Sequence, residues 1–316
     1  MVAKIFIDGE SGTTGLQIRE RLAGRRDLEI ISIDAERRKD LDEKKRLLNA
    51  ADIAILCLPD DAARQSVSLI DNDTTRVIDA STAHRVAEGW AYGFAEMDKR
   101  QAATIAAARR VANPGCWPQG AIATLRPLVE AGLLPADFPT VVNGISGYSG
   151  GGKSMIADYE AAGADANEFM PYGLTFQHKH IPELVEYARL EATPLFTPVV
   201  GNFAQGMITM VPLQLGWLDR VPDGATLHAA IADHYAAITG SFVEVAPYAN
   251  VERLPELNPE VYNDTNRMRL HVFSNDSRAQ AVLIAVYDNL GKGASGAAVQ
   301  NLNLMLGVPA DTSLAA

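Results

Sequence analysis

The chain has few cysteines and no excess of positive charge. Only two of its 316 residues are cysteine, so it can form neither the disulfide framework of a small secreted domain nor a zinc site of four thiolates. Lysine and arginine number 28 against 39 aspartate and glutamate residues, which gives a net charge of −11 with neutral histidines. Because nucleic-acid binding usually needs a basic surface, this balance argues against a nucleic-acid partner.

Long apolar runs and a leader segment are also missing. No apolar run reaches the roughly 18 residues expected of a membrane-spanning helix. The first strand is expected within a few residues of Met1, which leaves no room for a signal or transit peptide. The chain is 47% hydrophobic and 21% charged, enough for a large buried core. We therefore expect a soluble cytoplasmic protein, with no membrane partner and with both cysteines reduced.

Short β-branched runs alternate with helical spacing in the first third of the chain. Such alternation predicts right-handed crossovers and a parallel sheet, with or without a bound nucleotide. The predicted strands are 2–8, 28–34, 52–58, 76–79 and 110–112, and the predicted helices are 13–23, 36–49, 60–70 and 97–108.

The pattern changes after about residue 140, where several strands follow one another without a helix between them. This favours antiparallel or mixed pairing. The predicted strands are 140–146, 199–202, 207–215, 242–248, 268–273 and 281–287, and the predicted helices are 153–162, 183–190 and 227–238. A last helix, 296–306, is expected to return to the first domain. The fold class is therefore α/β, a Rossmann-like parallel-sheet domain plus an α+β domain with a mixed or antiparallel sheet.

The first predicted strand runs into a glycine-rich loop at the start of a helix. Residues 9–15 read Gly-Glu-Ser-Gly-Thr-Thr-Gly, a variant of the GxGxxG dinucleotide fingerprint. Small residues let the backbone approach a pyrophosphate, and the helix N-terminus offers N–H groups and a partial positive charge. Any tight strand-to-helix turn can use glycine, but this position favours a dinucleotide. The residues expected at the cofactor are Gly9, Ser11, Gly12, Thr13, Thr14 and Gly15.

The residues after the second predicted strand leave the cofactor type open. Asp34 ends that strand about 20 residues beyond the loop, where an acid binds the ribose 2′-OH of NAD. Arg37 and Arg38 follow and can pair with the 2′-phosphate of NADP instead. Both arginines can equally belong to the solvated surface of the next helix.

The segment Asn113-Pro114-Gly115-Cys116-Trp117-Pro118 distinguishes the two cysteines. Pro118 suits the first turn of a helix, which places Cys116 at a helix entrance. There the helix dipole favours the thiolate, a strong nucleophile toward an acyl carbon. Cys57 lies inside an apolar strand and is expected to be an inert buried side chain.

A cysteine nucleophile needs a proton partner, and His178 and His180 are the best candidates. They precede Pro182, which fits a helix start, and Glu183 is then close enough to orient His180. The HxH spacing also suggests a metal pair, but a third ligand is not apparent, so no metal is expected. Four further histidines are of less interest: His228 and His234 fit a structural role on an amphipathic helix, and His84 and His271 are undecided.

Motifs that occur in order along nearly the whole chain resemble those of one enzyme family. They are the glycine loop, residues 113–116, the glycine-rich segment 144–152, the His-Lys-His of 178–180 and the segment 289–296. Together they resemble the shorter form, type 2, of the N-acetyl-gamma-glutamyl-phosphate reductases. This family is related to aspartate-semialdehyde and glyceraldehyde-3-phosphate dehydrogenases.

The resemblance implies NADPH-dependent reduction of N-acetyl-gamma-glutamyl phosphate to the semialdehyde in arginine biosynthesis, with release of phosphate. It implies an NADP-binding domain of residues 1–115 plus about 289–316, and a catalytic and oligomerisation domain of residues 116–288 in a homodimer or homotetramer. Cys116 matches the nucleophile and His180 the acid/base, with His178 as second choice. The other implied contacts are Ser146, Gly147 and Asn289 at the cofactor, and Arg85, Asn113 and Lys153 at the substrate.

Two other functions remain open at this stage. An aspartate-semialdehyde type of dehydrogenase would use the same cysteine, histidine and nucleotide loop on another acyl phosphate. A non-catalytic NADPH sensor would leave Cys116 unreactive. An anionic substrate also needs local positive charge, which Arg85, Lys153, Lys179 or Lys292 can supply if they are not ordinary surface residues.

Overall fold

A computed structural model describes residues 2–255 and 257–315 of the chain. The residues form two compact units. The first unit contains the residues up to Ala95, together with Arg100–Pro114 and Ala294–Leu314. The second unit contains Glu96–Lys99, Gly115–Gly293 and the end of the chain. No helix in the described ranges has the length and apolar character needed to span a membrane.

The first unit is built on a parallel sheet with the strand order β2-β1-β3-β4-β6-β5. The strands are β1 (Ala3–Asp8), β2 (Leu28–Ile31), β3 (Ile53–Leu56), β4 (Arg76–Asp79), β5 (Ala91–Tyr92) and β6 (Arg110–Ala112). The helices of this unit are α1 (Thr13–Leu22), α2 (Leu41–Ala50), α3 (Asp60–Ser68), α4 (Gln101–Ala107) and α9 (Gly296–Leu306). The predicted parallel sheet is therefore confirmed.

Alternation along β1 explains why helices cover both faces of this sheet. Ile5 and Ile7 enter one core, while Phe6 between them enters a second core. Helices α1, α4 and α9 complete the first core, and α2 and α3 complete the second. Helix α9 supplies Val299 and Leu302 to the same core as Ile5, which confirms that the last helix returns to the first domain.

Several predicted elements of the first unit are shorter than expected, among them the helix predicted as 97–108, which begins only at Gln101. The second strand ends at Ile31, the last residue paired with β1, so Asp34 lies beyond it. The predicted helix 36–49 begins only at Leu41, because the Asp40 carboxylate caps it by accepting the N–H groups of Asp42 and Glu43. The short strand β5 has no counterpart in the prediction.

The second unit is built on a mixed sheet with the strand order β11-β12-β13-β10-β7-β9-β8, which confirms the predicted class. The strands are β7 (Val141–Gly147), β8 (Phe169–Pro171), β9 (Leu195–Gly201), β10 (Met207–Gln214), β11 (Val243–Val245), β12 (Met268–Asn275) and β13 (Gln280–Tyr287). The helices are α5 (Cys116–Glu130), α6 (Gly152–Ala162), α7 (Ile181–Tyr187) and α8 (Gly224–Ala236).

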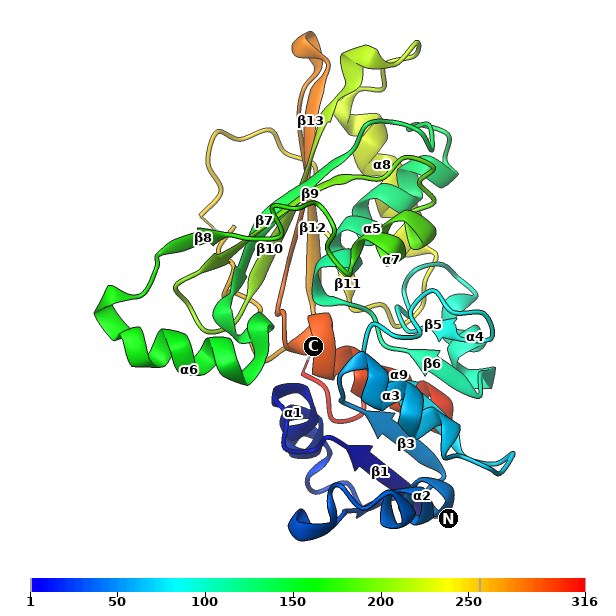
Figure 1. Cartoon of the computed structure of the whole chain (residues 1–316). Coiled ribbons are helices and arrows are strands. Elements are labelled where there is room, and N and C mark those ends of the chain that lie inside the picture. Colours follow the sequence, from blue (N-terminus) through cyan, green and yellow to red (C-terminus); the bar gives the residue numbers. More distant parts are fainter. Residues whose placement is uncertain (1, 256, 316) are drawn as a thin grey trace. The chain divides into compact units, whose positions relative to one another are not determined.

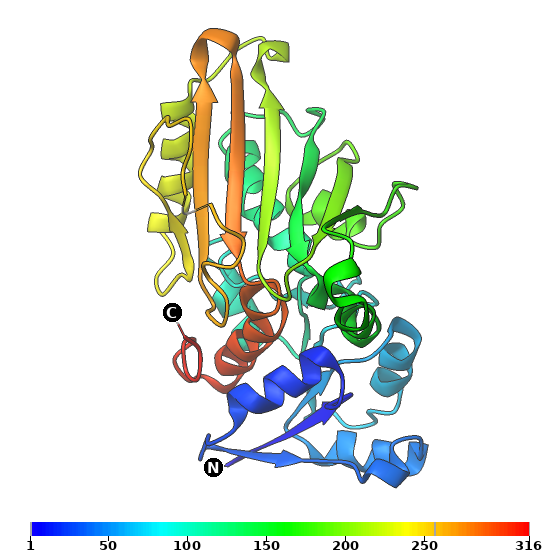
Figure 2. The ribbon, with the colours of Figure 1, turned by 90° about the vertical axis from the view of Figure 1, so that its left-hand side faces the viewer.

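Helices α5, α7 and α8 lie along one face of the mixed sheet (Figure 1). Figure 2 looks onto the strands from the opposite side. Along β10 the buried side chains Met207, Thr209 and Val211 alternate with partly exposed Ile208 and Met210. The sheet therefore has a buried, helix-covered face and a second face that we call the open face.

Candidate active site

The glycine loop of the first unit is shaped by close backbone approaches. Gly9 has φ +88°, and a Cβ there would lie 2.3 Å from the carbonyl oxygen of Cys57. A Cβ on Gly15 would lie 2.4 Å from the carbonyl oxygen of Gly9. These two glycines are therefore required by the turn itself.

The start of α1 can accept an anion. Gly12 is the N-cap residue of α1, no side chain caps the helix, and the first turn holds no acidic residue. The leading N–H groups of Thr13 and Thr14 have no acceptor inside the helix. Their donors and the helix dipole fit the pyrophosphate of a dinucleotide, which needs donors without a competing carboxylate.

The residues beyond β2 are arranged differently from the prediction. Asp34 is exposed and precedes a short turn of 3-10 helix, Ala35–Arg37. The guanidinium of Arg37 faces acidic partners, with Asp40 at 2.7 Å and Glu43 at 3.1 Å. The hydrogen bonds that Arg37 donates to Asp40 contribute most to raising the pKa of Arg37. Arg38 is also exposed.

Two residues near the end of β2 were missed by the sequence reasoning. Ser32 directly follows the strand, and its hydroxyl donates to Glu10 at 3.0 Å. Arg19 of α1 pairs with the same glutamate and donates to the Ser32 hydroxyl at 3.3 Å. Their position in the sequence could have identified them, because the residue at the end of the second strand of such a sheet faces the ribose of a bound dinucleotide.

Asn113 is held firmly inside the first unit. Its side-chain amide donates to the Ala294 carbonyl at 3.0 Å and accepts from Asn301 at 3.0 Å. Its backbone carbonyl accepts from the Arg85 Nε at 3.1 Å, and its N–H donates to the Asp79 carbonyl at 2.7 Å. These bonds fix the chain three residues before Cys116.

Neither Arg85 nor Lys292 is an ordinary surface residue. Arg85 is buried, and its guanidinium also reaches the Ala80 carbonyl at 3.3 Å. Lys292 pairs with Glu96 at 2.6 Å, with side-chain exposures of 1% and 2%. A lysine already neutralised inside the fold cannot serve a substrate anion, so that part of the expectation is wrong for Lys292. Lys153 and Lys179 are exposed.

His84, which the sequence left undecided, has a buried acidic partner in the first unit. Its Nδ1 lies 2.6 Å from the carboxylate of Asp79, and its ring stacks on Trp90 with centroids 4.1 Å apart. The same carboxylate accepts from the Ser81 hydroxyl at 2.7 Å. His84, Asp79 and Ser81 therefore form a hydrogen-bonded network shortly before Arg85 in the chain.

Cys116 is the first residue of α5 in the second unit, as predicted, with Gly115 as the N-cap. Four leading N–H positions of a helix lack intrahelical acceptors, here residues 115–118. The Gly115 N–H donates to the Glu183 carboxylate at 3.0 Å, and Pro118 has no N–H. The N–H group of Trp117 belongs to the same leading turn.

His180 and Glu183 belong to the start of α7. His180 is the N-cap residue, Pro182 lies in the first turn, and Glu183 follows in that turn. Both side chains are buried, with exposures of 7% and 1%. Because Glu183 accepts from Gly115, one hydrogen bond ties the helix that begins at Cys116 to the helix that begins after His180.

His178 is enclosed by aromatic rings. Its ring is edge-on to Tyr172 at 5.7 Å, to Phe196 at 5.0 Å and to His180 at 4.6 Å between centroids. Its Nδ1 accepts the backbone N–H of His180 at 3.2 Å. An accepting Nδ1 carries no proton, so this contact favours the neutral form of His178.

Two buried tyrosines, Tyr172 and Tyr287, lie near Cys116. The Tyr172 hydroxyl accepts from the indole N–H of Trp117 at 2.9 Å. Burial raises the pKa of Tyr172, and the negative charge of a Cys116 thiolate raises it further. The same two causes act on Tyr287. By contrast, burial raises the pKa of the Cys57 thiol to about 12, so that cysteine is inert as predicted.

The predicted nicotinamide segment lies at the end of β7. Ser146 is buried, and a Cβ on Gly147 would lie 2.6 Å from the Ala204 carbonyl oxygen. Asn289 accepts from the Gly206 N–H at 2.7 Å and donates to the Ser149 hydroxyl at 3.0 Å. Asn289 therefore joins the loops that follow β7 and β9.

Two family models match the chain. Residues 4–105 match the semialdehyde dehydrogenase NAD binding domain. Residues 116–289 match the semialdehyde dehydrogenase dimerisation domain.

Curated relatives match over nearly the full length. An N-acetyl-gamma-glutamyl-phosphate reductase of Mesorhizobium japonicum is 75% identical over 98% of this chain and 100% of its own. A relative of the same name from Chelativorans is 75% identical over 97% of this chain and 99% of its own. N-acetyl-gamma-glutamyl-phosphate reductase 2 of Nostoc is 51% identical over 98% of this chain and 99% of its own.

Solved structures share the fold at low identity. Aspartate semialdehyde dehydrogenase II from Vibrio cholerae superposes with a TM-score of 0.73 at 16% identity, covering 97% of this chain and 99% of its own. The Candida albicans aspartate semialdehyde dehydrogenase with NADP gives 0.65 at 14% identity, covering 98% and 99%.

Proposed function

Because the chain belongs to the N-acetyl-gamma-glutamyl-phosphate reductase family of semialdehyde dehydrogenases, we propose that it reduces N-acetyl-gamma-glutamyl phosphate with NADPH. The products are N-acetylglutamate 5-semialdehyde and phosphate, a step of arginine biosynthesis. One observation of the structure supports this chemistry most directly. The buried Glu183 carboxylate ties the start of α5, which carries Cys116, to the start of α7, which follows His180.

Cys116 acts as the nucleophile. Its thiolate forms a C–S bond to the acyl carbon, and the bond from that carbon to the phosphate oxygen breaks, which leaves a thioester and free phosphate. Bound NADPH supplies the hydride that reduces the thioester carbon. When the aldehyde C=O forms again, the C–S bond breaks and Cys116 returns to the thiolate.

His180 and the start of α5 manage the charge that develops on the acyl oxygen. In this proposal, the N–H groups of Cys116 and Trp117 donate to this oxygen in both tetrahedral stages. His180 gives a proton to the oxygen of the hemithioacetal and takes it back as the aldehyde forms. Glu183 is a positioning residue, since its carboxylate holds the Gly115 N–H.

The first unit holds the cofactor in this proposal. Its pyrophosphate lies against the loop and the start of α1, contacted by Gly9, Ser11, Gly12, Thr13, Thr14 and Gly15. Arg37 and Arg38, with Arg19 beside Ser32, are the cations proposed to bind the 2′-phosphate. Residues 1–115 plus about 289–316 form the NADP-binding domain, and residues 116–288 form the catalytic and oligomerisation domain. Ser146, Gly147 and Asn289 complete the nicotinamide side.

The substrate contacts are proposed from the positions of three residues. Arg85 supplies positive charge to the phosphate from the segment that also holds Asn113. Asn113 acts by fixing the backbone that leads to Cys116. Lys153, exposed at the start of α6, is a second cation proposed for the substrate. The cytoplasm, where thiols stay reduced, is the proposed site of action.

The open face of the mixed sheet is the proposed surface for self-association. His271, Ile284, Met210, Asn143 and Thr197 form a row across β12, β13, β10, β7 and β9. A two-fold axis through such a row would bring the same face of both copies together. The match to a dimerisation domain supports a homodimer, alone or as half of a homotetramer.

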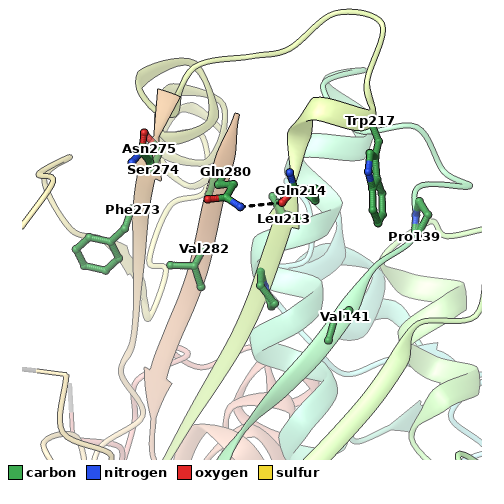
Figure 3. A pocket seen from close by; sticks show the side chains of 12 residues that line it. Pro139, Val141, Leu213, Gln214, Trp217, Phe273, Ser274, Asn275, Gln280 and Val282 are labelled. Atoms are coloured by element: carbon green, nitrogen blue, oxygen red, sulfur yellow. Dashed lines mark hydrogen bonds between the residues drawn. The ribbon is translucent and has the colours of Figure 1, made fainter. Parts of the chain in front are cut away.

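A hollow of about 500 Å³ opens on this face, as Figure 3 shows. Val141, Pro212 and Val282 line it, and Trp217 stands at its edge with 67% of its surface exposed. Gln280 donates to Gln214 at 3.0 Å beside it. The hollow includes none of the candidate site residues, so an apolar contact with a second copy accounts for it better than a substrate does.

The proposal is tested in the phosphate-dependent oxidative direction. N-acetylglutamate semialdehyde and aspartate semialdehyde are each supplied with phosphate and either NADP or NAD, and reduced cofactor is followed by absorbance. We expect fast reduction of NADP with the first substrate only. Preference for aspartate semialdehyde would replace the proposed substrate.

The matched cysteine variants test the nucleophile. Cys116→Ala should lose activity by about 10⁴-fold or more while NADPH binding persists. Cys57→Ala should keep wild-type activity because that thiol stays protonated. Normal activity in Cys116→Ala would refute the covalent mechanism.

A separate variant tests the acid/base. His180→Asn should lower kcat by about 10²-fold or more.

A further inference from the structure

A tyrosine hydroxyl from the mixed sheet reaches the first turn of the helix that carries Cys116. Tyr287, the last residue of β13, donates to the Cys116 carbonyl at 2.6 Å. The Gly120 N–H donates to the same hydroxyl at 3.2 Å. The Thr209 hydroxyl of β10 lies 3.1 Å from it. The hydroxyl thus contacts both the Cys116 carbonyl and the Gly120 N–H, which face each other four residues apart in the first turn of the helix.

The directions of these three hydrogen bonds follow from proton counting. A carbonyl can only accept, so the single proton of the Tyr287 hydroxyl lies toward Cys116. The hydroxyl oxygen then accepts from the Gly120 N–H and from the Thr209 hydroxyl. Its one donor and both acceptor positions are filled. Burial raises the pKa of Tyr287, so the proton stays in place at neutral pH.

The residues around the Tyr287 hydroxyl leave room for it inside the core. Tyr287 is fully buried and Thr209 is almost fully buried. A Cβ on Gly120 would lie 2.8 Å from the Tyr287 hydroxyl and 2.9 Å from the Thr209 hydroxyl. Glycine at this position therefore leaves the space that the hydroxyl occupies, although glycine is a poor helix residue.

The bonded carbonyl belongs to the same peptide group as the Trp117 N–H. A hydrogen bond to the oxygen of a peptide polarises the group and strengthens its N–H as a donor. The Trp117 N–H lies at the start of α5, in the turn that stabilises a Cys116 thiolate and the acyl oxyanion in the proposed function. A contact on the buried side of the helix can therefore act on chemistry at its start, where Cys116 is partly exposed.

We propose that Tyr287 is a positioning residue for the reaction. Through the Cys116 carbonyl, it holds the first turn of α5 and strengthens the Trp117 N–H toward the thiolate and the oxyanion. This inference rests on the proposed function, in which Cys116 is the nucleophile.

The test compares Tyr287→Phe with a matched control on the same helix. The Tyr235 hydroxyl of α8 donates to the Ala123 carbonyl of α5 at 2.9 Å and is also buried. Tyr235→Phe removes the same kind of bond two turns further along α5. Tyr287→Phe should lower kcat by about tenfold at nearly constant KM, less than the 10²–10³-fold loss of a direct oxyanion donor. Tyr235→Phe should stay within about twofold of wild type, since that bond lies away from the helix start.

A second readout does not depend on the substrate. The rate of Cys116 alkylation by iodoacetamide is measured against pH in the Cys57→Ala background. In Tyr287→Phe the profile should move to higher pH, because the helix start stabilises the thiolate less. In Tyr235→Phe it should not move. Equal thermal destabilisation of both variants, with no difference in kcat or in the alkylation profile, would reduce Tyr287 to a structural role and overturn the inference.

Substitutions at Thr209 keep the test decisive if Tyr287→Phe fails to fold. Thr209→Ser retains the hydroxyl donor and should keep kcat, whereas Thr209→Val removes it and should lower kcat by a few-fold. Equal kcat in these two variants would contradict the inference. Its failure is also distinct from failure of the proposed function, which would show as activity in Cys116→Ala.

Discussion

At the scale of single residues, burial decides which side chains can carry charge for chemistry. Lys292 and Glu96 neutralise each other inside the second unit, and the Lys292 ammonium also lies 5.7 Å from the Phe242 ring. Burial lowers the pKa of Lys292 against the opposing effect of Glu96. This pair therefore belongs to the framework of the second unit.

His234 of α8 supplies a prediction about pH. Its Nε2 donates to the Met97 carbonyl at 3.1 Å. Burial lowers its pKa below the ordinary value of 6.5, with a smaller lowering by Arg126, and against raising effects of Glu130 and Asp98. Below pH 6.5 the unfolded chain thus binds a proton that the folded chain does not. This contribution to stability is complete above pH 6.5 and is lost as the pH falls below it.

The measurement is the melting temperature at pH 7.5 and pH 5.5. His234→Gln keeps a side-chain donor for the Met97 carbonyl but cannot titrate. The variant should show a smaller loss of melting temperature between the two pH values than wild type. Parallel losses in both proteins would show that His234 does not contribute to acid sensitivity.

The positions of Cys116 and His180 at helix starts were predictable from the sequence because their signals are local. Pro118 and Pro182 mark the helix starts that place Cys116 and His180. Their partners were not predictable, since Tyr287 lies 171 residues from Cys116 along the chain. Only the pairing of the strands brings such a residue to the helix.

At the scale of the element, α5 is a helix whose first turn is held by groups outside it. Glu183 caps its leading N–H, and Tyr287 donates to its first carbonyl.

Elsewhere, the ends of the strands depend on long-range pairing more than on the propensity of the residues. The strand predicted as 28–34 stops at Ile31 because pairing with β1 ends there. The short strands β5 and β8 contain two and three residues, too few for an alternating pattern.

Gly120→Ala tests this description of α5. Alanine is favoured over glycine inside a helix by about 1 kcal/mol. Here, however, the added methyl group would overlap the Tyr287 ring and hydroxyl. Overpacking typically costs about 1–3 kcal/mol, so we expect a net loss of stability, measured by urea unfolding.

The same substitution should lower kcat, because the displaced hydroxyl no longer holds the Cys116 carbonyl. The control is the double variant Gly120→Ala with Tyr287→Phe. Its loss in kcat should be smaller than the product of the two single losses, since both act through one contact. Gly120→Ala with raised stability and unchanged kcat would contradict the close fit.

At the scale of the whole molecule, the two sheet classes were predictable from how strands follow one another. Strands separated by helices gave the parallel sheet, and consecutive strands gave the mixed sheet. The open face was not predicted. The alternation along β10 shows that its two sides differ, but both carry apolar residues such as Val211 and Met210. Which side the helices cover is decided by packing.

The last prediction concerns self-association through the open face. Met210 lies in the middle of the row between Ile284 and Asn143. Met210→Lys would place a charge on both copies near a two-fold axis, with no acidic residue in the row to pair with it. We expect the wild-type protein to sediment at two or four times the mass of one chain and the variant at half the wild-type mass, with a Kd raised by about 100-fold or more.

Leu41→Lys is the matched control, because Leu41 is an exposed apolar residue of α2 in the first unit. If Met210→Lys sediments at the wild-type mass, the association uses another surface. If both variants dissociate, the effect follows added charge and not the open face.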